Sequence, residues 1–93
     1  MKWLEIISLR TADVNEKEAL MYMKKFCRIV EKYTMAEAQS YTHSSVPGDL
    51  ALVITSEKEK DKVMGTDFGK YIAEVLKQFG LVDYNCWLLV DSK

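Results

Sequence analysis

The sequence is poor in the residues that most often carry chemistry. Its 93 residues include one histidine, two cysteines, one proline and four glycines. Cys27 and Cys86 lie far apart, and neither has a histidine or cysteine at metal-ligand spacing, which predicts two small buried side chains and no disulfide. A glycine-rich phosphate loop, a Ser–His–Asp set and a carboxylate pair at catalytic spacing are all missing. We therefore expect no metal and no cofactor.

An excess of charge of either sign is also missing. Thirteen Lys and Arg residues face fourteen Asp and Glu residues, which gives a net charge of −1, whereas nucleic-acid-binding proteins carry a basic face. The longest charged run, over residues 57–62, alternates in sign and is typical of a solvated loop or helical turn. No stretch reaches the ~20 apolar residues of a membrane span, and Glu5 interrupts the N-terminal apolar segment, which argues against a signal peptide. These absences predict a cytoplasmic protein with no nucleic-acid or membrane partner.

What the chain does contain fits one α+β domain over residues 1–93. Runs rich in β-forming residues predict four strands, and apolar residues spaced three and four apart predict two helices. The expected strands cover 2–10, 36–44, 50–55 and 84–90, and the expected helices cover about 15–33 and 66–79. With short, right-handed connections, this β-α-β-β-α-β order favours a ferredoxin-like sandwich, a four-stranded antiparallel sheet with both helices on one face.

Four local signals set the ends of these elements. Asp13 or Asn15 can cap the first helix, because each has a glutamate three residues further on. Thr66 is the expected N-cap of the second helix. Gly80 stands where a left-handed residue ends a helix in a Schellman motif. Gly48 follows the single proline, and this pair predicts the turn between the second and third strands.

The unusual feature of this sequence is that the expected sheet has large apolar residues on both faces. A sheet covered by helices on one side normally alternates to polar on the other, and large exposed apolar patches are rare in monomers. No segment remains to cover the second face, and a second copy is the simplest cover because two-fold dimers are the commonest oligomers. We expect a homodimer with these interface residues: Trp3, Ile7, Leu9, Val53, Trp87 and Leu89.

A few polar and aromatic residues are candidates for a ligand site. Glu5 shares a strand face with apolar residues, so its carboxylate needs either a partner or a position at the rim of the sheet. Its candidate donors are Tyr41, His43, Asn85 and Arg10. His43 is either a surface residue or an acid–base group, and Trp87 is either a packing residue or a ring platform. The candidate ligand-binding set is Glu5, Tyr41, His43, Asn85 and Trp87.

The element order, the length and the doubly apolar sheet resemble the dimeric α+β barrel superfamily. That group includes antibiotic-biosynthesis-type monooxygenases and stress-responsive barrel proteins. The segments WLEII and LKQFGLVDYNCW resemble a small family of uncharacterised prokaryotic proteins of this fold. The resemblance implies two sheets packed face to face with a cavity at the dimer axis. The monooxygenases use Asn, Trp and Tyr or His side chains around that cavity, and their positions do not align one by one with this chain.

Two classes of function follow. One is a binding or assembly module with a small-molecule cavity between the sheets. The other is a cofactor-independent, monooxygenase-like enzyme acting on a small organic substrate. Base-stacking RNA recognition is disfavoured because the third strand, residues 50–55, has no aromatic residue. A cavity lined by Glu5, His43, Tyr41 and Trp87 favours the enzyme, and a dry interior packed with the protein's own side chains favours the module.

Overall fold

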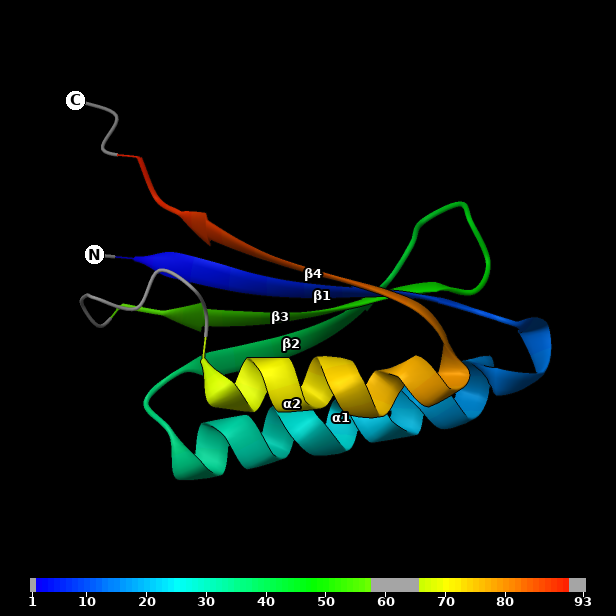
Figure 1. The fold of residues 1–93 in the computed structure, drawn as a ribbon, viewed down its shortest axis with the longest axis horizontal. Coiled ribbons are helices and arrows are strands. Elements are labelled where there is room, and N and C mark those ends of the chain that lie inside the picture. The colour runs from blue at the N-terminus through cyan, green and yellow to red at the C-terminus, as the bar shows by residue number, and fades with distance from the viewer. Residues whose placement is uncertain (1, 58–65, 91–93) are drawn as a thin grey trace.

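The computed structural model describes residues 2–57 and 66–90, and the charged residues 58–62 lie outside that part. The elements are β1 (Trp3–Thr11), a 3-10 turn η1 (Asp13–Asn15), α1 (Glu16–Tyr33), β2 (Glu37–Thr42), β3 (Asp49–Ser56), α2 (Asp67–Leu76), a 3-10 turn η2 (Lys77–Phe79) and β4 (Gly80–Leu88). The predicted β-α-β-β-α-β order is therefore confirmed. Figure 1 shows both helices on one side of the sheet, as expected for an α+β sandwich.

The four strands form one antiparallel sheet in the order β2-β3-β1-β4. The two central strands are β1 and β3, in a register that pairs Ile6 with Val53 and Ser8 with Ala51. β4 pairs with the other edge of β1, so that Leu4 lies opposite Trp87. Since side chains alternate along a strand and paired residues share a face, this register decides which residues meet on each side of the sheet.

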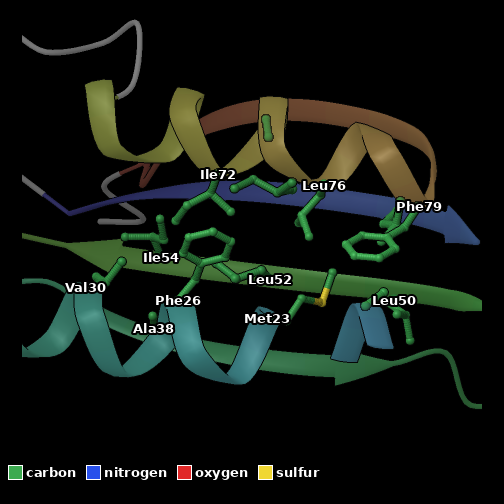
Figure 2. Packing of buried hydrophobic residues seen from close by; sticks show 14 residues of the cluster. Met23, Phe26, Val30, Ala38, Leu50, Leu52, Ile54, Ile72, Leu76 and Phe79 are labelled. Atoms are coloured by element: carbon green, nitrogen blue, oxygen red, sulfur yellow. The ribbon is translucent and has the colours of Figure 1, made fainter. Parts of the chain in front are cut away.

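The hydrophobic core fills the space between the helices and the sheet (Figure 2). Side chains from both helices point toward one another above the central strand β3. The labelled members of this cluster are Met23, Phe26, Val30, Ala38, Leu50, Leu52, Ile54, Ile72, Leu76 and Phe79. Burying each large side chain contributes about 1.5–3 kcal/mol to stability. The apolar residues that recur three and four apart in each helix are the ones that face this core.

The predicted N-cap is present at the start of α2 and absent at the start of α1. Thr66 caps α2 as predicted, because its hydroxyl accepts a hydrogen bond from the Gly69 amide at 2.9 Å. At α1 the residue Asn15 makes no side-chain cap. Its side-chain amide instead donates to the carbonyl of Phe79 in η2. The capping box predicted from Asn15 is therefore wrong, because a tertiary contact holds its side chain.

The predicted Schellman stop at Gly80 is also wrong. The α2 helix tightens into η2, and Gly80 is the first residue of β4, with the extended angles φ 160° and ψ −154°. Glycine is needed there for space, because a Cβ atom would collide with the backbone carbonyl of Arg10 on β1. The last strand consequently begins four residues earlier than the sequence predicts.

The connection between β2 and β3 contains the predicted turn. Gly48 adopts a left-handed φ of 88°, and its carbonyl accepts hydrogen bonds from the amide and the hydroxyl of Thr11 at 2.9 and 3.0 Å. This connection rises from the sheet on the side away from the helices (Figure 1). It therefore forms a wall at one end of the sheet face that the helices leave open.

Three residues predicted for the dimer interface face the helices instead. Trp3, Ile7 and Leu9 are 5%, 0% and 1% exposed, and Ile7 and Leu9 pack in the core between sheet and helices. The opposite side of β1 carries Leu4 and Ile6, which are only half-buried. The strand is apolar on both sides, and the sequence-based interpretation assigned its two sides the wrong way round.

Candidate functional site

No described element packs on the side of the sheet that faces away from the helices, the uncovered face. Its apolar residues include Leu4, Ile6, Val53, Leu81 and Trp87, as the strand pairing and the alternation of burial show. Trp87 is 57% exposed and Leu81 is 76% exposed. Leu89, just beyond β4, is 64% exposed, and its amide donates to the Lys2 carbonyl. Of the predicted interface residues, Val53, Trp87 and Leu89 remain available to a partner.

A groove of about 500 Å³ crosses one end of the uncovered face. Ser8 and Ala51 are paired on the two central strands and line the groove. The next pair along the same strands is Ile6 and Val53. The step from large to small side chains therefore hollows the sheet at this end.

The two edge strands supply the sides of this groove. Tyr41 and His43 lie on the β2 side, with Tyr41 paired to Ala51. Asp83 and Leu81 lie on the β4 side, with Asp83 paired to Ser8. Pockets of this size are typical for small organic molecules, and the walls offer both apolar and hydrogen-bonding surface.

An ion pair occupies the end of the groove next to the β2–β3 connection. The guanidinium of Arg10 donates to both carboxylate oxygens of Asp49, at 3.0 Å from Nε and 3.2 Å from Nη2. These hydrogen bonds raise the pKa of Arg10 and lower the pKa of Asp49. The positive charge of Arg10 is therefore already matched by a partner, and this end of the groove carries no net charge.

The ring of His43 is held by backbone groups of its own loop. Its Nδ1 accepts hydrogen bonds from the amides of Ser45 and Val46, at 3.1 and 3.0 Å. A nitrogen that accepts two N–H groups carries no hydrogen, so the neutral ring has its hydrogen on Nε2. Among the described residues Nε2 has no hydrogen-bond partner, and it presents an N–H donor for a ligand.

Glu5 lies on the other side of the sheet, which separates it from the groove. Its side chain is completely buried at the start of α2. One carboxylate oxygen accepts hydrogen bonds from the amide and hydroxyl of Thr66 at 3.2 and 3.1 Å, and from the hydroxyl of Tyr84 at 2.7 Å. The other accepts from the Thr66 hydroxyl at 2.9 Å. A carboxylate at a helix N-terminus is stabilised by the free amides and the helix dipole.

This arrangement leaves no space for a ligand beside Glu5. A Cβ atom at Gly69 would collide with Oε1 of Glu5, so a residue with a side chain at position 69 would displace the carboxylate. The Tyr84 hydroxyl also accepts a hydrogen bond from the thiol of Cys86 at 3.7 Å. Burial, followed by the hydrogen bond to Glu5, raises the pKa of Tyr84 strongly. Glu5 therefore links β1, β4 and α2 as a structural anchor.

The predicted ligand set is thus divided among three places. Tyr41 and His43 line the groove together. Asn85 and Trp87 share the uncovered face but lie beyond the groove, toward the start of β1. Glu5 faces the helices, and its donors are Tyr84 and Thr66 rather than the predicted Tyr41, His43, Asn85 or Arg10. The sequence-based set missed Ser8, Asp49, Ala51, Leu81 and Asp83 as groove residues.

Within residues 2–57 and 66–90, no three His, Cys, Asp or Glu side chains are grouped so that they could hold a metal ion. In the same part of the chain, neither helix has the length and hydropathy needed to cross a membrane.

Comparisons with known proteins establish the fold. No family model matches the sequence, and no curated protein matches it. Rv0793 from Mycobacterium tuberculosis superimposes with a TM-score of 0.73 at 8% identity, over 99% of this chain and 98% of that one. A conserved protein of unknown function from Bacteroides thetaiotaomicron, described as a possible oxidoreductase, gives a TM-score of 0.72 at 10% identity over 92% and 95%. The chain therefore shares its complete α+β fold with both of these proteins.

Proposed function

We propose that this protein is a homodimeric small-molecule-binding module. Two copies pair through their uncovered faces, and a ligand occupies the groove at the Tyr41–His43 end. The observation that carries this proposal is the groove itself, because it lies on the one sheet side that no described element covers and has polar groups in its walls. From its composition we further expect the protein to act in the cytoplasm without nucleic acid.

The energetics of the uncovered face favour pairing. Trp87 leaves 57% of its surface exposed, and a buried tryptophan removes up to about 250 Å² from water. At about 25 cal/mol per Å², covering the exposed part of Trp87 contributes roughly 3 kcal/mol in each copy. Leu4, Ile6 and Val53 extend the same surface along the central strands. The resemblance of the sequence to dimeric α+β barrels agrees with this pairing, and it rests in part on the same doubly apolar sheet.

A fragment-binding experiment tests the function. The ¹⁵N-labelled protein is titrated with a set of small aromatic fragments, and amide shifts are followed by NMR. We expect shifts at Ser8, Tyr41, His43 and Asp83, and weaker binding in Trp87→Glu, which separates the copies. Met21→Glu is the matched control, because Met21 is 64% exposed on α1 in the helix layer. Shifts confined to the helix layer, or no shifts at all, would contradict the proposal.

A cofactor-independent, monooxygenase-like enzyme acting on a small organic substrate is the second candidate. The specific observation in its favour is the fixed Nε2–H donor of His43, which lies in the same groove as the Tyr41 hydroxyl. The description of the Bacteroides neighbour as a possible oxidoreductase points in the same direction. Oxygen consumption in the presence of a fragment that binds would support this candidate. Binding without turnover would support the module.

A further inference from the structure

The charges in the groove define which ligands it accepts. Five of its lining residues can ionise, namely Arg10, Tyr41, His43, Asp49 and Asp83. Arg10 and Asp49 neutralise each other, and His43 is neutral when its Nδ1 accepts two amides. The backbone of Asp83 pairs with Ser8 on β1, but its carboxylate makes no hydrogen bond or ion pair with any residue in the described ranges. The groove therefore carries one unmatched negative charge, on the β4 side.

The hydrogen-bonding groups on the two sides differ in kind. Asp83 offers only acceptors when ionised, whereas His43 offers an N–H donor through Nε2 and Tyr41 offers a hydroxyl. Neighbouring strands are about 4.8 Å apart, so the backbones of β2 and β4 are separated by roughly 14 Å. Tyr41 and Asp83 stand on the two edge strands, on either side of the small pair Ser8 and Ala51, and all four residues line the groove. A ligand in this groove meets an acceptor at one end, a shallow floor in the middle and donors at the other end.

We propose that the groove binds a small organic amine, with its ammonium group on Asp83, its apolar body over Ser8 and Ala51, and a hydrogen-bond acceptor directed at His43. This inference rests on the proposed function. When a second copy covers the face, water leaves the groove and an unpaired Asp83 carboxylate becomes costly. An ammonium group removes that cost, whereas a carboxylate or phosphate ligand adds a second negative charge beside the first.

Three probes with one ring and different charges test the inference. Tyramine carries an ammonium group, tyrosol a neutral hydroxyl and 4-hydroxyphenylacetate a carboxylate, on the same phenol. Each is titrated into the full-length ¹⁵N-labelled protein at neutral pH and low salt. We expect tyramine to bind at least about tenfold more tightly than 4-hydroxyphenylacetate, with tyrosol between them, which corresponds to the attraction of one close charge pair. The largest shifts should fall at Leu81, Asp83 and His43.

Asp83→Asn and Glu37→Gln form the variant pair. Both remove one exposed carboxylate from the uncovered face, but Glu37 lies at the far end of β2 from the groove. We expect Asp83→Asn to reduce the preference for tyramine to less than about twofold, and Glu37→Gln to preserve it. Equal or tighter binding of 4-hydroxyphenylacetate overturns the amine inference and leaves the binding module intact. If these probes do not bind while other fragments bind the groove, the amine inference is likewise overturned and the binding module is left intact. If neither probes nor fragments bind, both proposals fall.

Discussion

Removal of one hydrogen-bonding partner at Glu5 is expected to destabilise the whole fold. The carboxylate is fully buried and receives hydrogen bonds from the amide and hydroxyl of Thr66 and from the hydroxyl of Tyr84. A hydrogen bond to a charged group contributes about 1.5–3 kcal/mol. Tyr84→Phe leaves the buried carboxylate without its shortest bond, so we expect a loss of about 2 kcal/mol. For a domain of this size, that loss lowers Tm by roughly 8–16 °C.

Glu5→Gln probes the same network from the acceptor side. The amide keeps the shape but loses the charge and one acceptor oxygen, and we expect a loss of about 1–3 kcal/mol. Because Glu5 and Tyr84 share one bond, the double variant should lose about 1.5 kcal/mol less than the sum of the single losses. Glu37→Gln is the control, and an exposed carboxylate of this kind should change stability by less than about 0.5 kcal/mol.

Urea denaturation followed by circular dichroism measures the parent and the four variants under the same conditions. Additive losses in the double variant would show that Glu5 and Tyr84 do not interact. A Glu5→Gln variant as stable as the parent would refute the assignment of Glu5 as an anchor. It would instead favour a role for Glu5 as a ligand-site residue, as the sequence predicts, because functional residues commonly cost stability.

Two further predictions concern Gly80 and Cys27. Gly80→Ala and Gly80→Asn should each lower the free energy of unfolding in urea by about 2 kcal/mol or more, because any Cβ atom at this position meets the Arg10 carbonyl. Gly48→Asn should lower it less, since asparagine tolerates the left-handed φ of Gly48. A similar loss at both sites would contradict this account. Burial raises the pKa of the Cys27 thiol. In the Cys86→Ser variant, iodoacetamide should therefore alkylate Cys27 about tenfold more slowly in the folded protein than in urea, as followed by mass spectrometry. Equal rates would show that the thiol is not shielded.

The sequence predicted the order of elements because each is encoded locally. The apolar positions of α1 and α2 recur at helical spacing, Thr66 caps the helix that directly follows it, and Gly48 fixes its turn through its own φ. The predicted Schellman stop at Gly80 was wrong for a reason that local sequence patterns do not contain. Its requirement for glycine comes from the approach of β1, which is distant in sequence.

The site was harder to predict because it depends on strand register. β1 is apolar on both sides, so periodicity alone does not show whether Ile7 or Ile6 faces the helices. The groove exists because Ser8 pairs with Ala51, and no local signal marks that pairing. The donors of Glu5 were also missed, since Thr66 and Tyr84 approach it only after the helix and β4 have docked on β1.

Sedimentation equilibrium tests most directly the central claim that the uncovered face pairs with a second copy. At micromolar concentration, the account predicts a mass of twice the 10.7 kDa chain. Trp87→Glu should shift the protein toward the single-chain mass, because it places a charge in an apolar contact, whereas Met21→Glu should leave the dimer intact. A parent protein that sediments at the mass of one chain would contradict the claim, as would a dimer that Met21→Glu dissociates and Trp87→Glu does not.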